Sequence, residues 1–176
     1  MKPGKSIALL MCLALVGCTV TCGERPSRKG AAHTGKDLPE FSLEDPRGKT
    51  FTREDVLENG AVFVVTAPIL SNKRRQEGWA RYLKATKHRG KGRLVFLQDM
   101  SPSHFKRAAL SQMEKQSDPD ADPLLLIDPE GEMRSKLGVE REDTIVLVFD
   151  KNGRCVHEER GKPSEKSASR IWGALG

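Results

Sequence analysis

The fold is decided by a continuous apolar and β-branched run, Ala61-Val62-Phe63-Val64-Val65-Thr66-Ala67. A strand with one face in water alternates apolar and polar residues, so an unbroken run is typical of a strand buried on both faces of a sheet. Further runs of the same character lie at 94–97, 124–127 and 144–149. The sequence therefore predicts a sheet that is covered on both sides.

Helical segments separate these predicted strands. Ser71, Ser103 and Ser164 each precede a segment whose apolar residues recur at the three-four spacing of one helix face, and serine favours the N-cap position. Thr52 is a similar cap for a short helix, and residues 132–137 predict another one. We therefore expect helices between the strands and a last helix at the C-terminal end.

The end of the chain adds a hairpin. Asp150-Lys151-Asn152-Gly153 is a strong turn signal, and residues 154–159 are expected to return antiparallel to the strand before it. Strands that alternate with helices and close with a hairpin indicate an α/β sandwich around a mixed sheet.

Several short motifs occur in a characteristic order. The first is Gly35-Lys36-Asp37-Leu38-Pro39-Glu40-Phe41-Ser42-Leu43 with Asp45 and Gly48, and the later ones are Leu126–Gly131, Leu137–Val139 and Leu147–Gly153. This arrangement resembles the redoxin and peroxiredoxin domains of the thioredoxin-like superfamily. The resemblance implies a thioredoxin-like domain over 37–176, an α/β sandwich whose mixed central sheet has helices on both faces.

The chain departs from this family where the reactive cysteine belongs. In the family, the loop after the strand that matches 61–67 carries a cysteine at a helix N-terminus, where the helix dipole favours thiolate. Residues 66–75 contain no cysteine, and Ser71 is interpreted as a helix cap. Many members also place a proline before the strand that matches 144–149, but residues 140–144 contain none. These departures argue against ordinary thiol catalysis at this position.

The N-terminus has the organisation of a lipoprotein signal. A basic head with Lys2 and Lys5 precedes an apolar run of about a dozen residues, too short for a bilayer-spanning helix of about 20 residues. Leu15-Val16-Gly17-Cys18 resembles the bacterial lipobox, which implies cleavage of a 1–17 signal peptide and lipidation, including palmitate, on Cys18. More than one acyl chain gives a stable membrane anchor.

The expected mature protein is a membrane-attached domain in the bacterial cell envelope. Residues 18–36 are rich in small and basic residues and are interpreted as a flexible tether before the 37–176 domain. Thr19 follows the cysteine, and absence of Asp at this position favours the outer membrane, on its periplasmic side, in a diderm host. The membrane is therefore the first expected partner, and an envelope protein is the second.

Charge and composition exclude other classes of function. The chain has 30 Lys and Arg against 24 Asp and Glu, and loss of Lys2 and Lys5 with the signal leaves about +4. We interpret this excess as too modest and diffuse for a nucleic-acid-binding protein. The four histidines, His33, His88, His104 and His157, show no metal-ligand spacing, so neither a metal nor another cofactor is predicted.

Two groups of residues remain as candidate sites. Lys73, Arg74 and Arg75 lie in the first turns of a predicted helix and form a candidate anion-binding surface, with a solvated charge run as the alternative. Cys22 and Cys155 are the candidate thiols. They are interpreted as a disulfide pair, as redox groups or, for Cys155, as a small buried apolar residue.

The residues support two functions of different classes. The first is a non-catalytic thioredoxin-like module that binds a partner at the membrane. The alternative is a thiol-disulfide oxidoreductase or peroxiredoxin-like antioxidant enzyme that works through Cys155, Cys22 or both. The absence of sulfur from residues 66–75 favours the first.

Overall fold

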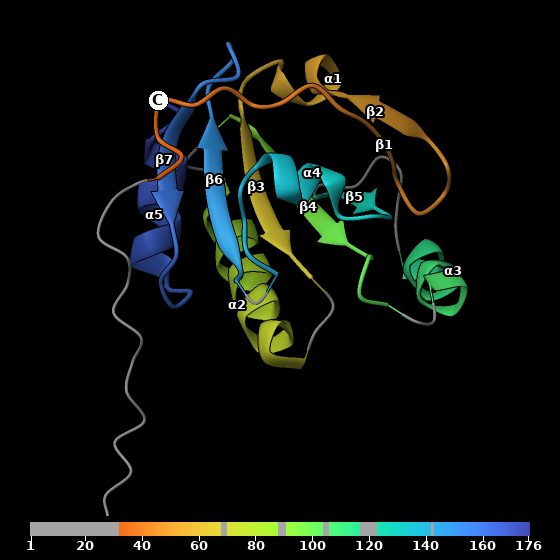
Figure 1. Cartoon of the computed structure of the whole chain (residues 1–176). Helices are drawn as coiled ribbons and strands as arrows, with labels where there is room; N and C mark the ends of the chain where they lie inside the picture. Colours follow the sequence, from red (N-terminus) through yellow and green to blue (C-terminus); the bar gives the residue numbers. More distant parts are fainter. Residues whose placement is uncertain (1–31, 68–69, 88–90, 104–105, 117–122, 142) are drawn as a thin grey trace, which may run out of the picture.

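The computed structural model describes residues 32–67, 70–87, 91–103, 106–116, 123–141 and 143–176. These residues form one seven-stranded sheet with strand order β2-β1-β5-β4-β3-β6-β7 (Figure 1). The strands are β1 (Ser42–Glu44), β2 (Thr50–Thr52), β3 (Ala61–Thr66), β4 (Arg93–Asp99), β5 (Leu124–Asp128), β6 (Ile145–Phe149) and β7 (Cys155–Glu159). The helices are α1 (Arg53–Leu57), α2 (Leu70–Thr86), α3 (Lys106–Gln116), α4 (Glu132–Lys136) and α5 (Glu165–Gly173).

The sheet is mixed, as predicted. β3, β4 and β5 run parallel, whereas β6 is antiparallel to β3, β7 to β6 and β1 to β5. All of β3 and β6 is buried, which explains the unbroken apolar runs. Because β6 is reversed, its first residue Ile145 pairs with Val65 near the end of β3. The carboxyl ends of three strands and the start of a fourth therefore meet at one edge.

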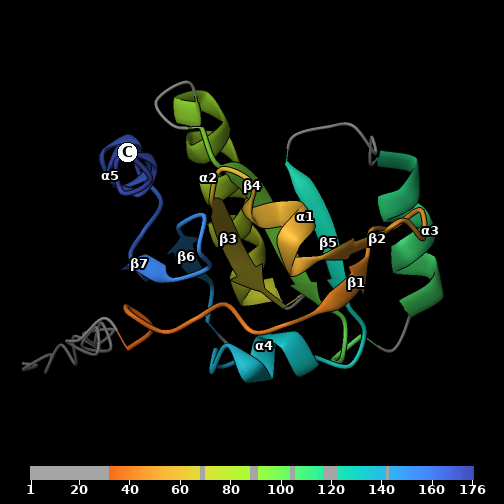
Figure 2. The same ribbon diagram turned by 90° about the horizontal axis from the view of Figure 1, so that it is seen from above.

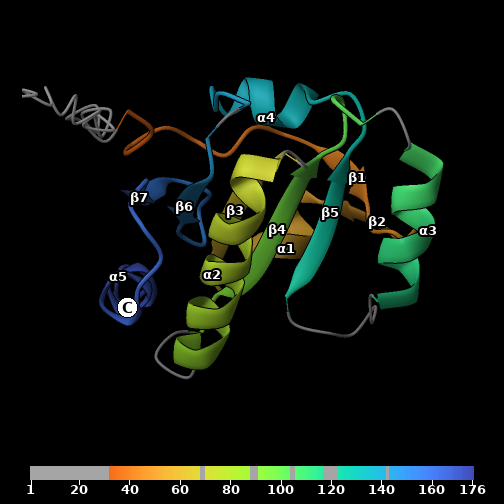
Figure 3. The same cartoon turned by 90° about the horizontal axis from the view of Figure 1, so that it is seen from below.

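Helices cover both faces of the sheet, which confirms the predicted sandwich. α2 and α5 lie on one face and α1 and α4 on the other (Figures 2 and 3). The α2 side is built around Trp79 and Trp172, and the Trp172 indole N–H donates to the Leu83 carbonyl at 3.0 Å. On the opposite side Phe63 packs edge-on against Phe149, with ring centroids 5.6 Å apart.

The predicted helix caps were only partly correct. Ser164 caps α5, where its hydroxyl accepts the Ser167 N–H at 3.1 Å. The predicted cap at Ser71 is wrong, because α2 already begins at Leu70. Residues 104–105 lie outside the described ranges, so the cap at Ser103 stays a prediction. Thr52 caps α1 as expected, and its N–H donates to the Asp55 carboxylate at 2.7 Å.

Gly78 gives α2 its close contact with the segment before α5. A Cβ atom at position 78 would lie 2.9 Å from Cγ of Pro163, which is closer than real Cβ contacts. Glycine costs about 1 kcal/mol relative to alanine inside a helix. Glycine is nevertheless needed at position 78, because α2 and the segment around Pro163 approach too closely for any side chain to fit.

Residues 33–37 form a strap along the outer edge of β7, named here the N-terminal strap. The Gly35 N–H donates to the Cys155 carbonyl and the Cys155 N–H donates to the Lys36 carbonyl, each at 2.8 Å. His33 is buried, and both its backbone N–H and its Nδ1 contact one Glu158 oxygen, at 3.0 and 2.9 Å. The packed domain therefore begins at or before His33, earlier than the expected boundary between 36 and 37.

The strap ends in a small network of charges. Burial alone would raise the pKa of Glu158, but hydrogen bonds from Arg160 and His33 hold it below its ordinary value. The Arg160 guanidinium lies 2.5 Å from Glu158 and 2.9 Å from Asp143. These contacts attach the strap to β7 and to the loop before β6.

The predicted signal peptide, Cys18 and Cys22 lie outside the described residues. Within the ranges that the structure describes, no helix has the length and apolar character needed to cross a bilayer.

Candidate functional site

The candidate site lies where β3, β4 and β5 end and β6 begins, and it is called the strand-end site below. In open α/β sheets ligands bind at the carboxyl ends of the strands. This is also the place where the family resemblance puts a reactive cysteine and a facing proline. Here the corresponding residues are Ala67 after β3, Asn72 at the start of α2, and the segment Arg141–Thr144 before β6.

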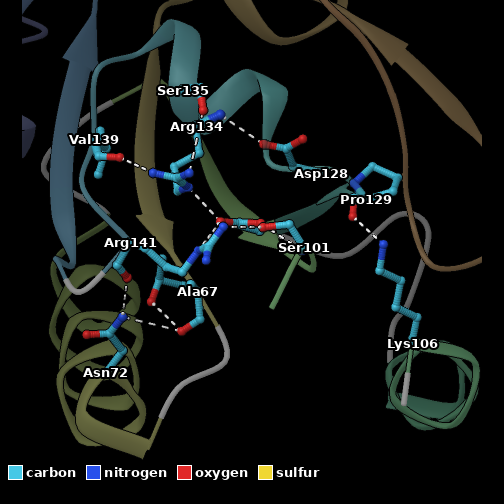
Figure 4. Close-up of polar contacts among 12 residues, drawn as sticks. Ala67, Asn72, Ser101, Lys106, Asp128, Pro129, Arg134, Ser135, Val139 and Arg141 are labelled. Carbon is cyan, nitrogen blue, oxygen red and sulfur yellow. Dashed lines mark hydrogen bonds and ion pairs between the residues drawn. The ribbon is translucent and has the colours of Figure 1, made fainter. Parts of the chain in front are cut away.

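A buried amide occupies the centre of the strand-end site. Asn72 is 1% exposed, and its Nδ2 donates to the Ala67 carbonyl at 3.4 Å and to the Arg141 carbonyl at 3.3 Å (Figure 4). One side chain thus ties the end of β3 to the segment before β6. An amide has no nucleophilic or redox chemistry at neutral pH, so this contact is structural.

Two hydroxyl groups lie beside this amide. Thr66 and Thr144 are both 1% exposed, and their oxygens lie 3.4 Å apart. The Thr66 hydroxyl also lies 3.5 Å from the Ala67 carbonyl, which can accept its proton. The two hydroxyls therefore find their partners within the protein and are not presented to a substrate.

A cluster of one buried acid and two arginines lies on the other side of the site. Asp99 is fully buried; one of its oxygens accepts Arg134 Nε at 2.5 Å and the other accepts the Ser101 N–H at 2.8 Å. Arg141 Nε lies 4.0 Å from Asp99, and Arg134 also donates to the Val139 carbonyl. Figure 4 shows the side chains of Arg134 and Arg141 pointing toward one another, with Ser101 beside them. Asp99 therefore serves to fix two arginines.

Asp128 is the second buried acid of this edge. It pairs in register with Asp99 on the neighbouring strand and accepts the backbone N–H of Arg134 at 2.8 Å. Burial raises the pKa of Asp128 even though hydrogen bonds from the start of α4 oppose this shift. Its contacts orient α4 over the end of β5.

The predicted basic residues follow Asn72 in the first turns of α2. Arg74 is exposed and Arg75 is half-buried, both within the first turns of α2, whereas the side chain of Lys73 is outside the described part. Neither arginine forms an ion pair with a residue that the structure describes. The anion-binding role of the three stays a prediction.

Cys155 is not brought to the strand-end site. It pairs with Phe149 at the far end of β6, whereas Thr144 lies at the near end. Cys155 has no disulfide partner among the described residues; it is 1% exposed, and burial raises the pKa of its thiol to about 11. Its sulfur lies 3.5 Å from the His157 carbonyl. At neutral pH Cys155 is therefore a protonated, covered thiol, and its pairing with Cys22 stays a prediction.

Sequence reasoning did not single out Asn72, Asp99 or Arg134. A signal was available for Asp128, which directly follows a buried apolar run, and a weaker one for Asp99, which is separated from its run by Gln98; both positions indicate the end of a strand. Among the described residues, no group of three His, Cys, Asp or Glu side chains is arranged to hold a metal ion.

The chain was compared with family models, curated proteins and solved structures, and only the solved structures gave matches. No protein-family model matches the chain, and no curated protein matches it. Among solved structures, a thio-disulfide isomerase from Thermus thermophilus is similar with a TM-score of 0.61 and 21% identity, covering 81% of this chain and 96% of that one. A structure described as a putative thiol:disulfide interchange protein DsbE from Chlorobium tepidum has a TM-score of 0.60 and 18% identity, covering 81% and 98%.

A third similar structure comes from Streptococcus pneumoniae. This pneumococcal exposed lipoprotein thioredoxin has a TM-score of 0.56 and 21% identity, and the alignment covers 77% of this chain and 98% of that one. At such identities the likeness concerns the fold. With its mixed sheet and helices on both faces, the chain has a thioredoxin-like α/β fold.

Proposed function

We propose that this protein is a membrane-anchored bacterial lipoprotein whose thioredoxin-like domain acts as a non-catalytic binding module in the cell envelope. The observation that carries the non-catalytic part is the buried Asn72 amide. This amide lies at the junction of β3 and α2, where the family resemblance puts a thiol. Its Nδ2 group donates to two backbone carbonyls. A module of this kind keeps the fold and its partner surface without the reactive group.

The position of Cys155 supports the same proposal. Thiol chemistry needs thiolate, and a pKa of about 11 leaves Cys155 almost entirely protonated at neutral pH. Its burial at the far end of β6 also keeps oxidants and disulfide substrates away. Both features argue against redox turnover through this residue.

The proposed anchor rests on Leu15-Val16-Gly17-Cys18. One of the similar structures is itself described as an exposed lipoprotein thioredoxin, which is consistent with the same arrangement here. Thr19 after the lipidated cysteine supports an outer-membrane location, facing the periplasm, in a diderm host. Several acyl chains would make the attachment stable.

The anchor is tested by growing cells that produce the full chain with radiolabelled palmitate. We expect label on the protein, recovery in the membrane fraction and accumulation of the precursor when the lipoprotein signal peptidase is inhibited. Cys18→Ala should abolish the label, whereas Cys22→Ala should retain it. Equal labelling of the wild type and Cys18→Ala would overturn the lipoprotein proposal.

The binding role is tested with a photocrosslinking residue at the strand-end site of the full chain in cells. Arg141 is exposed at this site, and Lys151 is exposed on the hairpin at the other end of β6, so the two positions form a matched pair. We expect one discrete crosslinked envelope protein from position 141 and none from position 151. Identical crosslinking from both positions would contradict a partner surface at this site.

The alternative function is a thiol-disulfide oxidoreductase or peroxiredoxin-like enzyme, and its support is the fold shared with thiol:disulfide proteins. Disulfide-reductase and peroxidase assays on the purified full chain separate the two functions. We expect no turnover above that of Cys155→Ser. Turnover that Cys155→Ser abolishes would establish the enzyme and refute the binding module.

A further inference from the structure

The basic charge of this protein is concentrated in one segment. Residues 70–93 contain nine Lys and Arg but only one acid, Glu77, whereas the rest of the chain contains 21 basic and 23 acidic residues. The whole positive excess of the chain is therefore found between the start of α2 and the first residue of β4. The interpretation of the charge as diffuse does not hold for this segment.

The exposed side of α2 displays this charge along one face. Arg74, Arg81 and Lys84 are exposed and lie seven and ten residues apart from the first, which places them on one side of the helix. They face away from Trp79 and Leu83, which pack into the core. Figure 3 shows the outer side of α2 in the foreground, on the face of the sheet opposite α4. These three residues are named the α2 basic face.

The α2 basic face differs from the other charged parts of the domain. Several basic side chains elsewhere in the domain have acidic partners, as in Arg53–Glu40, Lys106–Glu130 and Arg160–Asp143. Within the described residues no carboxylate forms an ion pair with the three residues of the face. Arg81 instead lies over the Tyr82 ring, with its guanidinium carbon 4.7 Å from the centroid. Its positive charge is therefore available to an anion from outside the domain.

We propose that the α2 basic face lies against the anionic headgroups of the membrane that holds the protein. This inference rests on the proposed lipid anchor, which keeps the domain close to a bilayer. The residues between Cys18 and position 32 can span at most about 50 Å, enough for a domain of this size to turn any side toward the surface. One acidic residue, Glu77, lies on the same exposed side.

The chemistry of the face fits a bilayer surface better than an inserted segment. Among the α2 side chains that the structure describes, the exposed ones are Arg74, Glu77, Arg81, Lys84 and Ala85, and none of these is a large apolar residue. Such a helix makes an electrostatic contact at headgroup level, which depends on lipid charge and on salt. Each basic residue near an anionic surface strengthens the contact about fivefold. Reversal of three charges should therefore weaken docking by about a hundredfold or more.

The test uses the full lipidated protein, purified in detergent and reconstituted into vesicles. A fluorophore is attached at Ala85→Cys, an exposed position beside Lys84, in a Cys22→Ser background, and energy transfer to a headgroup-labelled lipid is measured. Vesicles of phosphatidylcholine alone are compared with vesicles in which phosphatidylglycerol replaces part of it. We expect more transfer with phosphatidylglycerol and loss of the difference at high salt.

Charge variants identify the surface responsible. Arg74→Glu with Arg81→Glu and Lys84→Glu should abolish the response to lipid charge, and the corresponding glutamine variant should reduce it. A control with the same total charge change carries Arg107→Glu, Lys136→Glu and Lys151→Glu, all exposed and outside α2. This control should keep the response, and circular dichroism checks that every variant is folded.

Two results would overturn the proposal. Energy transfer that is independent of lipid charge would show that α2 does not dock on the membrane. The second result uses a soluble polyanion such as polyglutamate. If polyglutamate binds the α2 basic face at a salt concentration where anionic vesicles do not, the face recognises an acidic macromolecule instead. Failure of the lipid anchor gives a different signature, because the protein would then not float with neutral vesicles at high salt.

Discussion

The reactivity of Cys155 gives the sharpest test of how this domain differs from a thiol enzyme. Burial raises the pKa of this thiol from 9.0 to about 11. At pH 8 the thiolate fraction is therefore about a hundredfold lower than for an unperturbed cysteine, and only thiolate attacks an alkylating reagent. With 1% of the residue exposed, access lowers the rate further. We expect alkylation at least about a hundred times slower than in the unfolded chain.

The measurement is a time course of iodoacetamide labelling in which mass spectrometry follows the peptide that contains Cys155. The same chain in concentrated urea is the control, since its thiol is exposed and has its ordinary pKa. In the folded protein the rate should rise about tenfold per pH unit above pH 8 and should not level off near pH 9. A plateau near pH 9, or a rate within a few-fold of the urea control, would refute the covered thiol and revive the enzyme alternative.

Three further predictions concern the parts that hold the strand-end site and its helices together. Asn72→Ala removes two long buried hydrogen bonds and should lower the free energy of unfolding by about 1–2 kcal/mol in urea titrations; no change would mean that the amide does not tie the two segments. Gly78→Ala should destabilise the protein by about 1 kcal/mol or more, because overpacking against Pro163 exceeds the gain in helix propensity, and Pro163→Ala should reverse the sign. Burial raises the pKa of Asp128 above 3.8, so the protonated carboxyl favours the folded state. The resulting contribution to the free energy of unfolding is complete below pH 3.8 and is lost as the pH rises through the raised pKa. Urea titrations at several pH values compare the wild type with Asp128→Asn, and the wild type should lose stability relative to the variant as the pH increases above 3.8. A difference in the free energy of unfolding that does not change with pH would contradict the raised pKa.

The elements with strong local signals were predictable from the sequence. β3 and β6 are buried on both faces, and such strands need apolar residues at every position. Ser164 caps its own helix with a contact three residues away, so the signal is local. β2 was missed because Thr50–Thr52 is short and mostly polar, and it is a strand only through its pairing with β1.

The candidate site was less predictable, because its contacts join distant parts of the chain. The absence of cysteine could be read directly from residues 66–75, but the role of Asn72 depends on the Arg141 carbonyl, 69 residues away. The boundary of the domain was misplaced for a similar reason. His33 lies in a segment of small and polar residues, and its backbone N–H and Nδ1 both contact Glu158, which is 125 residues away.

The proposed lipid anchor on Cys18 gives the N-terminal strap a mechanical consequence. The strap runs antiparallel to β7, and its outermost described contact joins His33 to Glu158. Tension that arrives from the N-terminal side therefore acts on this pair first and on the contacts of Gly35 and Lys36 next, before it reaches the sheet. Each strap residue that detaches adds about 3.3–3.6 Å of chain. Under such a load the contacts of the strap are therefore broken before those of the sheet.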